Sequence, residues 1–329
     1  MKAIQIQTPG NAKLVHIKEP SPGKGQVLVK IHGATVNPID TYFFEGKIPS
    51  PFANTPLTPG CEFAGVVTAL GEGVTKFNIG DRVWGCNQLV RGDQGAWAEY
   101  ALVQESFCHP LQDEVSEEAI LSVGLNGMTA FLALVETAKL HADDHVLIHG
   151  ASGNVGALAV QIAALAQASV VATTSSAEKQ HYLESLGAGQ VELYNQKSFM
   201  EAYIQEQAGT FSLFLSTVPI EDYHWVLQLL GKHARIIILS GRQNLALVPT
   251  GELYTKNINM YGIALFNYEP EPLAEASDYL QTRLAQKKLQ TSELKRFALD
   301  EYSAAVHYAK QGVSNQRARH QKVLISFNL

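Results

Sequence analysis

Short apolar runs alternate with glycine- and proline-containing turns over the N-terminal third of the chain. The β-like segments are KAIQI, QVLVKIHGATV, FAGVVTAL and DRVWG, and the turns between them are PSPGKG, TPG and GEG. Short strands with turn signals at intervals of about 8–12 residues are typical of an all-β unit. Helical patterning begins near Ser116 and continues through EEAILSVGLNGMTAFLALVETA.

From Ala142 onward, strands alternate with helices. The segments are, in order, HVLIHGA, NVGALAVQIAALAQ, SVVATT, EKQHYLESLGA and QVELY, and the strands SLFLST, RIIILS and NINMYGIAL follow. Regular strand–helix alternation predicts a doubly wound parallel sheet. The segment from about Phe266 to Leu329 is predicted to form helices and a closing strand, KVLISF. The predicted fold class is α/β, with a parallel-sheet domain beside a β domain.

Size and charge narrow the functional classes. A chain of 329 residues predicts two domains, at roughly 100–200 residues each. Apolar residues make up 46% and charged residues 17%, as in a globular protein with a large core. The net charge of −6 argues against nucleic acid as a partner. The uncharged run from Val146 to Ala177 is long enough to cross a membrane, but its glycines and polar residues divide it into strand, turn, helix and strand, so no membrane partner is expected.

The cysteines suggest a reducing compartment. Cys61, Cys86 and Cys108 are widely spaced and form no CxxC pair, so they predict neither a disulfide framework nor a four-thiolate zinc site. The N-terminal segment MKAIQIQTPGNAKL contains no apolar stretch of signal-peptide length. The expected location is therefore the cytoplasm.

A glycine loop provides the main functional signal. The strand VLIHG is followed by ASGNVG, residues 151–156, and then by an alanine-rich helix. Glycines in this context let backbone N–H groups approach a pyrophosphate, while the helix N-terminus supplies a partial positive charge. The alternative is a tight strand–helix turn that binds no ligand.

The end of the next strand predicts which dinucleotide is bound. Proteins that bind NAD usually place Asp or Glu about 20 residues beyond the glycines, where it holds the ribose 2′-hydroxyl. This chain has Thr173-Thr174-Ser175-Ser176 there, followed by Glu178 and Lys179. Hydroxyls and a lysine can receive a 2′-phosphate, so NADPH is favoured over NADH. The alternative is that Ser175 and Glu178 form a capping box and that Lys179 is solvated.

Several motifs together resemble a known family. They are PGCEFAGVVTALGEGVTKFNIGDRVWG (Pro59 to Gly85), VNPIDTYFFEG, NGMTAF and the ASGNVG loop. In this order they resemble the medium-chain dehydrogenase/reductase superfamily, and within it the zinc-free quinone oxidoreductases related to zeta-crystallin. The resemblance implies a GroES-like catalytic domain over residues 1–123, completed by 266–329, and an NADPH-binding Rossmann domain over 124–265.

The resemblance also bears on metal binding. Zinc-dependent relatives have ligands at positions that are Asn37, Cys61 and near Leu125 here, so only Cys61 could bind a metal, whereas catalytic zinc takes three protein ligands. The four-cysteine lobe of those relatives is missing, since Cys86 stands alone. His145 and His149 cannot share a metal either, because four residues of strand separate them by about 13 Å. No metal is expected.

Site residues follow from the resemblance, position by position. Asn37, Tyr42 and Thr129 are expected at the nicotinamide end of the cofactor, although they could equally be turn, core and helix-interior residues. The remaining expected contacts lie on the pyrophosphate (Ser152, Gly153, Asn154, Val155, Gly156), around the 2′-phosphate (Ser175, Ser176, Lys179, Tyr194) and along the other cofactor wall (Ser240, Gly241, Phe266).

Three departures from the family pattern suggest an altered substrate preference. Asn154 replaces the second glycine of the loop and has to tolerate the backbone angle of that glycine. Phe44 replaces an arginine. The strand ending in FLSTVP has Ser216 and Pro219 where relatives carry Asp and Gly.

The expected chemistry follows from the missing metal. A hydride acceptor that no Lewis acid polarises has to spread the resulting charge by conjugation, as quinones and α,β-unsaturated carbonyls do. The prediction is an NADPH-dependent quinone or enone reductase in which Tyr42 donates a hydrogen bond to the developing oxyanion and Asn37 lies beside it. The alternatives are a zinc alcohol dehydrogenase and a non-catalytic or RNA-binding crystallin-like protein.

The C-terminal region bears on partners. The tail carries the cations Lys310, Arg317, Arg319 and Lys322, which would suit RNA or cofactor phosphates. The strand from Asn257 to Phe266 is apolar on both faces and carries no charge. An unguarded edge strand of this kind predicts a homodimer.

Overall fold

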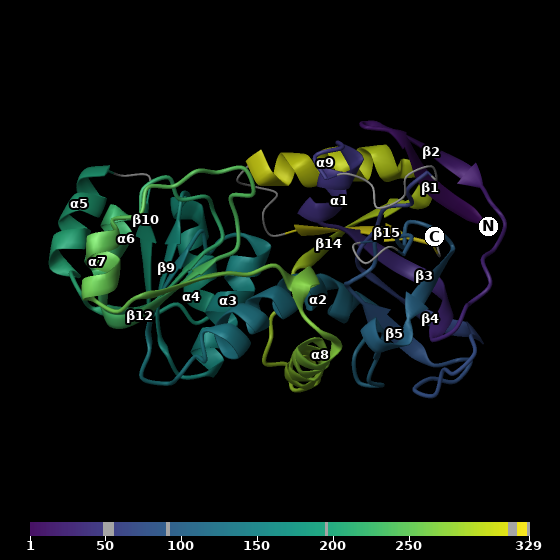
Figure 1. The fold of residues 1–329 in the computed structure, drawn as a ribbon, viewed down its shortest axis with the longest axis horizontal. Coiled ribbons are helices and arrows are strands. Elements are labelled where there is room, and N and C mark those ends of the chain that lie inside the picture. The colour runs from purple at the N-terminus through teal and green to yellow at the C-terminus, as the bar shows by residue number, and fades with distance from the viewer. Residues whose placement is uncertain (49–55, 90–92, 195–196, 315–320, 328–329) are drawn as a thin grey trace. The chain divides into compact units, whose positions relative to one another are not determined.

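A computed structural model describes residues 1–48, 56–89, 93–194, 197–314 and 321–327. The chain divides into two compact units (Figure 1). Unit 1 contains Met1–Leu125 and Phe266–Leu329, and unit 2 contains Asn126–Leu265.

Unit 1 is built on a mixed sheet. An N-terminal hairpin pairs β1 (Lys2–Thr8) with β2 (Asn11–His16). The strands of the larger sheet lie in the order β14 (Glu293–Ala298), β15 (Gln321–Ser326), β3 (Gln26–Val36), β4 (Phe63–Leu70), β5 (Arg82–Gly85) and β7 (His109–Pro110). A further strand, β6 (Tyr100–Gln104), also pairs with β3.

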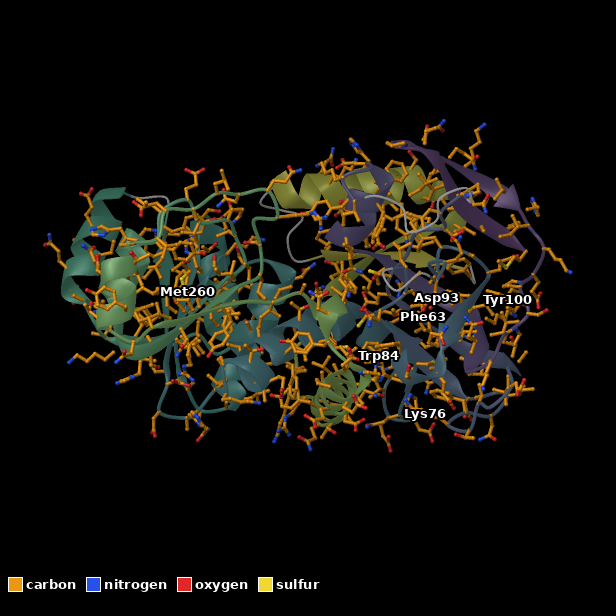
Figure 2. The ribbon with its side chains drawn as sticks, in the orientation of Figure 1. Phe63, Lys76, Trp84, Asp93, Tyr100 and Met260 are labelled. Carbon is orange, nitrogen blue, oxygen red and sulfur yellow. The ribbon has the colours of Figure 1, made fainter. Side chains whose placement is uncertain are left out.

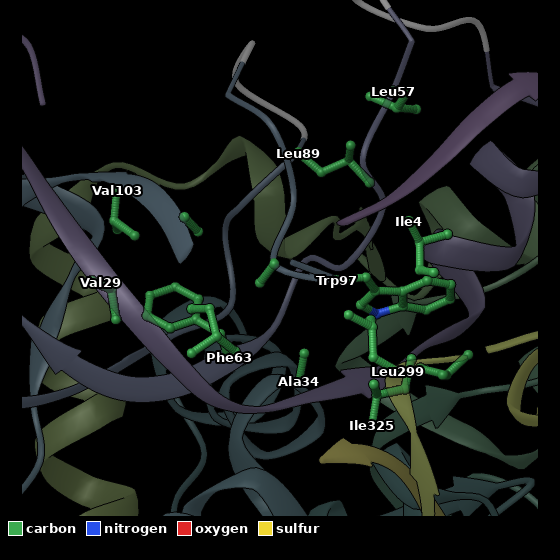
Figure 3. Packing of buried hydrophobic residues seen from close by; sticks show 14 of the residues in the cluster. Ile4, Val29, Ala34, Leu57, Phe63, Leu89, Trp97, Val103, Leu299 and Ile325 are labelled. Carbon is green, nitrogen blue, oxygen red and sulfur yellow. The ribbon is translucent and has the colours of Figure 1, made fainter. Parts of the chain in front are cut away.

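The C-terminal segment completes this unit. Strand β15 pairs antiparallel with β3, with Val323 opposite Val36. Ile4 near the N-terminus and Ile325 near the C-terminus belong to the same apolar cluster as Phe63 and Trp97 (Figure 3). Trp97 is fully buried, and its indole N–H donates to the Thr35 carbonyl at 3.1 Å. The two ends of the chain therefore share one hydrophobic core.

Helices and short turns surround the sheet of unit 1. The helix α2 starts in unit 1 and crosses into unit 2. The elements are α1 (Pro38–Phe44), η1 (Glu105–Phe107), α2 (Glu117–Phe131), η4 (Leu265–Asn267), α8 (Pro270–Ala285), η5 (Leu299–Glu301) and α9 (Tyr302–Ser314).

Unit 2 contains a parallel sheet in the doubly wound order. From β8 (His145–His149) the chain first adds β9 (Ser169–Thr174) and β10 (Gln190–Leu193) on one side. It then adds β11 (Phe211–Ser216), β12 (Leu230–Ile238) and β13 (Asn259–Gly262) on the other. The connecting elements are η2 (Leu132–Thr137), α3 (Asn154–Leu165), η3 (Ala177–Lys179), α4 (Gln180–Ser185), α5 (Lys197–Glu206), α6 (His224–Leu229) and α7 (Thr250–Thr255).

The predicted fold class is confirmed: the chain is α/β and combines a β unit with a doubly wound parallel sheet. The uncharged run from Val146 to Ala177 forms β8, a loop, α3, β9 and the start of η3, as predicted. The helical run Glu117–Thr137 is also long and apolar enough to cross a membrane, but most of it is buried within the fold.

Two predicted elements differ from the structure. The strand expected over Asn257 to Phe266 is confined to Asn259–Gly262, because Asn257 has a left-handed backbone (φ 53°) and the chain enters η4 at Leu265. The C-terminal segment also contains β14, ELKRFA, which was expected to be helical. Its three charged residues are exposed and its three apolar residues are half-buried, without regular alternation, but its backbone pairs with β15.

Candidate functional site

The glycine loop of unit 2 begins with a left-handed turn at Gly150 (φ 77°) and ends at Gly153, which caps α3 in an extended conformation. Asn154 is the first residue of α3 and does not have a positive φ. The expectation that Asn154 has to tolerate a special backbone angle is therefore wrong. The position that needs glycine for its φ is Gly150, which was not singled out from the sequence.

Gly156 and Gly153 differ in the space around them. A Cβ on Gly156 would lie 2.7 Å from both the Ala151 Cα and the Gly150 carbonyl oxygen, so this glycine permits close packing of α3 on the loop. A Cβ on Gly153 would meet only the Gly150 oxygen, at an ordinary 3.6 Å. The space beside Gly153 is therefore open to a ligand. The first N–H groups of α3, which include those of Asn154 and Val155, have no acceptor within the helix.

Hydroxyl groups from neighbouring strands hold the loop in place. Thr217 Oγ1 donates to the Gly150 carbonyl at 2.8 Å, and Thr174 Oγ1 donates to Ser152 Oγ at 3.1 Å. Ser152 is 2% exposed, so its side chain is part of the loop's internal support. Thr217 belongs to the divergent FLSTVP segment, and Ser216 Oγ donates to the Val218 carbonyl at 2.6 Å. These residues therefore preserve an ordered strand end despite the departure from the family pattern.

His149, at the end of β8, forms an aromatic cluster. Its ring centroid lies 4.7 Å from that of Tyr194 and 5.3 Å from that of Trp225. Its Nδ1 is 2.8 Å from Thr173 Oγ1, and burial lowers the pKa of the imidazole to about 4. The neutral ring thus supports the end of the strand and the position of Tyr194. From the sequence, His149 was considered only as a metal ligand.

The candidate 2′-phosphate residues follow β9. Ser176 precedes the turn η3, and its N–H donates to Thr174 Oγ1 at 3.2 Å. Lys179 ends this turn and is only 6% exposed, while Ser175 is half-buried. The alternative with a Ser175–Glu178 capping box and a solvated Lys179 is wrong, because Ser176 occupies the N-cap position and Lys179 is buried.

The remaining expected cofactor contacts lie on different elements. Ser240 and Gly241 follow β12 in unit 2, where Gly241 has a φ of 91°. The Ser240 hydroxyl is buried and makes no hydrogen bond among the described residues. Thr129 is half-buried on α2 in unit 2, whereas Phe266 is the first residue of the returning part of unit 1.

Asn37 and Tyr42 belong to unit 1, where the sequence VNPID starts α1. Asn37 precedes the helix and is 2% exposed, and its N–H donates to the Asp40 carboxylate at 2.8 Å. Tyr42 is half-buried on the helix, with Lys47 Nζ 5.8 Å from its ring centroid. Tyr42 is thus within reach of solvent, whereas Asn37 is enclosed.

A buried charge network surrounds Asn37. Glu62 accepts hydrogen bonds from the amide nitrogen of Asn37 at 3.1 Å and from the N–H of Leu125 at 2.7 Å, and the Thr35 hydroxyl donates to it as well. Lys322 Nζ lies 2.7 Å from Glu62 Oε2. This network was not predicted, because Glu62 and Lys322 are far apart in sequence and Glu62 was assigned no role, although it follows Cys61 in the family motif.

The predicted cationic tail is not one surface. Lys322 is 1% exposed and ion-paired with Glu62, because β15 is a central strand of its sheet. Lys310 pairs with Glu45 at 2.6 Å. Arg317 and Arg319 lie outside the described residues. The suggestion that Lys322 contributes to an RNA- or phosphate-binding tail is therefore wrong.

The donor groups at the metal-ligand positions of zinc relatives do not fit catalytic zinc. Cys61 is fully buried, and its thiol donates to Asp40 at 3.6 Å. Burial, together with the charges of Asp40 and Glu62, raises the pKa of that thiol well above its usual value. Asn37 directs its amide nitrogen, which cannot bind a metal, toward Glu62, and Leu125 offers an apolar side chain. Across the described ranges, no three His, Cys, Asp or Glu side chains converge as a metal site would require.

Asp40 holds the backbone of this region. Its Oδ1 accepts the N–H groups of Gly60 at 3.1 Å and Cys61 at 2.9 Å. Burial raises the pKa of the Asp40 carboxyl to about 7, and these hydrogen bonds oppose the rise. Asp40 therefore joins the start of α1 to the loop that precedes β4.

Comparisons with known proteins agree with this architecture. Residues 23–113 match the alcohol dehydrogenase GroES-like domain, and residues 154–282 match the family described as zinc-binding dehydrogenase. The chain is 31% identical over 290 residues to the quinone oxidoreductase of Sus scrofa, which covers 85% of each chain.

Solved structures show the same likeness. A quinone oxidoreductase from Pseudomonas syringae pv. tomato superposes with a TM-score of 0.84 at 26% identity, covering 98% of this chain and 99% of the other. A mycobacterial protein solved in complex with NADPH has a TM-score of 0.83 at 24% identity, covering 99% and 100% of the two chains. The second likeness bears on the fold alone.

Proposed function

Since the chain belongs to the quinone oxidoreductase family of the medium-chain dehydrogenase/reductase superfamily, we propose that it reduces quinones or α,β-unsaturated carbonyls with NADPH and without a catalytic metal. The observation that carries the proposal is the hydrogen-bonded network around Asn37 and Cys61. In this network, Asn37 and Cys61, which occupy positions where zinc relatives bind the metal, make hydrogen bonds within the protein instead.

The loop of unit 2 supports a dinucleotide cofactor. The open space beside Gly153 and the N–H groups at the start of α3 fit a pyrophosphate. When bound, NADPH supplies a hydride from its nicotinamide ring. The chain's own part is to bind and orient the cofactor. Two further contacts are proposed: Tyr194, which packs on His149, and Ser240, whose buried hydroxyl has no partner among the described residues.

The preference for NADPH rests on the end of β9. Ser175, Ser176 and Lys179 take the place of the acid that would repel a 2′-phosphate. A buried lysine beside a phosphate makes a strong charge-assisted interaction, because little water competes with it. The mycobacterial protein solved with NADPH shares this fold, which is consistent with the proposal.

The acceptor class follows from the chemistry of the donor set. Hydride addition to a quinone or an enone gives a phenolate or an enolate, whose charge is delocalised without a metal. We propose that the Tyr42 hydroxyl donates a hydrogen bond to that oxygen and that Asn37 contacts the reacting groups. Tyr42 is suited to this role because it is reachable from solvent, so an incoming substrate can meet it.

Domain roles and assembly are part of the same proposal. Residues 1–123 with 266–329 form the catalytic domain, and residues 124–265 form the cofactor domain, in the cytoplasm. The edge strand β13 carries Tyr261 at 37% exposure, next to the half-buried Met260 (Figure 2). Tyr254 is 73% exposed in the same unit. These apolar groups support a homodimer that pairs β13 with its copy.

A panel of quinones and enones tests the function. Purified protein is mixed with NADPH or NADH, and the loss of cofactor absorbance is followed for each acceptor. The proposal expects turnover with at least one conjugated acceptor, faster with NADPH, and none with saturated ketones. Binding of NADPH without turnover of any acceptor would instead favour the non-catalytic alternative.

A further inference from the structure

Lys322 and Glu62 form an ion pair in the interior of unit 1. Lys322 Nζ lies 2.7 Å from Glu62 Oε2, and the two side chains are 1% and 0% exposed. Burying two charges removes their hydration, and an apolar pair of similar volume often stabilises a fold equally well. A contribution to stability alone is therefore a weak explanation for this ion pair. The other contacts of Glu62 suggest a role in positioning.

Those contacts fix the carboxamide of Asn37. Its Nδ2 donates to Glu62 Oε2 at 3.1 Å and to Thr35 Oγ1 at 2.8 Å, so both amide hydrogens have acceptors. The Thr35 hydroxyl donates onward to Glu62. The other carboxylate oxygen, Oε1, accepts the N–H of Leu125 at 2.7 Å. The described hydrogen-bond and ion-pair partners of the Glu62 carboxylate are thus all donors, which suits a group that accepts at both oxygens.

We infer that Lys322 is a positioning residue: it stabilises the negative charge of Glu62, and Glu62 in turn holds the Asn37 carboxamide in one of its two flipped orientations. In that orientation the nitrogen faces Glu62, so the carboxamide presents its oxygen, an acceptor, on the opposite side. That oxygen is directed to accept, either from the capping N–H at the start of α1 or from an N–H or O–H group of a ligand that reaches this enclosed side chain. This inference rests on the proposed function, in which Asn37 contacts the reacting groups.

A neutral replacement of Glu62 cannot do the same. The glutamine of a Glu62→Gln variant has one oxygen and one NH₂ group. If its oxygen faces Asn37, its NH₂ group opposes the Leu125 N–H. If it is flipped, its NH₂ group opposes the Asn37 amide nitrogen. The double variant Glu62→Gln/Lys322→Met removes both buried charges, so it avoids the unpaired charge that destabilises Lys322→Met. Its glutamine still cannot accept from Asn37 and Leu125 at once, so the double variant separates positioning from stability.

The experiment compares Lys322→Met, Lys322→Arg and the double variant Glu62→Gln/Lys322→Met with the wild type. Lys295→Met is the matched control, because Lys295 is an exposed lysine on the neighbouring strand β14. Thermal unfolding, the Kd for NADPH, and kcat and KM for an active quinone are measured for each protein. Lys322→Met is expected to lower kcat by about 10-fold to 100-fold, the effect of a displaced active-site group.

Lys322→Arg retains the charge and is expected to keep kcat within about 3-fold of the wild type, as is the control. The double variant is expected to regain most of the thermal stability lost in Lys322→Met, but not its kcat. If the double variant regained both its thermal stability and its kcat, the Lys322–Glu62 ion pair would be purely structural and the inference would be overturned. If the double variant does not fold, the two single variants decide, since equal kcat values for Lys322→Met and Lys322→Arg would overturn it too.

A readout that needs no turnover keeps this inference separate from the proposed function. In protein labelled with ¹⁵N-asparagine, the side-chain NH₂ signal of Asn37 is expected to exchange slowly with solvent in the wild type and in Lys295→Met. It is expected to exchange faster in Lys322→Met and in the double variant. Unchanged exchange would overturn the inference, whereas slow exchange in a wild-type protein that reduces no acceptor would count against the proposed function only.

Discussion

Two glycines of the loop in unit 2 should respond in opposite ways to the same added methyl group. A Cβ on Gly156 would lie 2.7–2.8 Å from three backbone atoms of Gly150 and Ala151, which cannot move aside as a side chain can. A Cβ on Gly153 would have the Gly150 oxygen at 3.6 Å as its one near neighbour. Gly153→Ala should therefore spare the fold, and Gly156→Ala should strain it.

The magnitudes follow from opposing effects. Replacing glycine by alanine inside a helix gains about 1 kcal/mol. Overpacking against backbone atoms at 2.7–2.8 Å costs about 2–3 kcal/mol, the upper part of its usual range, so Gly156→Ala should lose about 1–2 kcal/mol of stability. At Gly153 the backbone angles (φ −80°, ψ 166°) suit alanine, and the weaker N-cap is offset by a less flexible unfolded chain. The stability of Gly153→Ala should stay within about 0.5 kcal/mol of the wild type.

Gly153→Ala, which should keep its stability, should lose affinity for NADPH. The methyl group added by Gly153→Ala occupies the space that a pyrophosphate needs, so this change should weaken NADPH binding by about 10-fold to 100-fold, or about 1.4–2.8 kcal/mol. Gly251→Ala is the control, because Gly251 is helical and a Cβ there meets nothing within 4 Å. That variant should change neither property for the worse.

The assays are urea unfolding followed by circular dichroism and NADPH titration followed by fluorescence. The reasoning would be refuted by a Gly153→Ala protein that binds NADPH as tightly as the wild type, since the open space would then not be the phosphate position. A Gly156→Ala protein as stable as the control would show that the close approach of α3 to the loop is not constrained.

Three further outcomes are expected. Lys179→Ala should weaken NADPH binding by about 1–3 kcal/mol and spare NADH, and equal losses for both cofactors in a titration would contradict the 2′-phosphate assignment. Burial lowers the pKa of His149 from 6.5 to about 4, so the unfolded chain takes up a proton first and stability falls as pH drops from about 6.5 toward 4. His149→Phe should remove about 2 kcal/mol of the difference in unfolding free energy between pH 7.5 and pH 5, measured by urea unfolding, and an unchanged difference would refute it. Tyr261→Lys should convert a dimer to a monomer in sedimentation at micromolar concentration, and a dimer that survives the change would place the contact elsewhere.

The architecture could be predicted because its signals are local. The short apolar runs between turn signals in the first third and the strand–helix alternation after Ala142 indicated the two kinds of unit. The loop was found because its glycines lie between a strand and a helix. The strand β14 was missed, because three of its six residues are charged and exposed, its apolar residues do not alternate with them, and its pairing with β15 cannot be read locally.

The site was predicted less completely, because its contacts join distant segments. Nothing near Lys322 in the sequence shows that it lies beside Glu62, and a lysine in a cationic tail is normally solvated. The burial of Lys179 and the role of Thr217 likewise depend on the packing of neighbouring strands. Asn37 could be found only through the family motif, since an asparagine before a helix is usually a simple cap.

The central claim is hydride transfer from NADPH to a conjugated acceptor without a metal. It is tested most directly with protein treated exhaustively with chelator, NADPH deuterated at the transferable position of C4, and an enone from the active panel. The account predicts that turnover is unchanged by chelation and that one deuterium appears on the β-carbon of the product. Turnover that is lost on chelation and restored by zinc, or a product without deuterium, would contradict it.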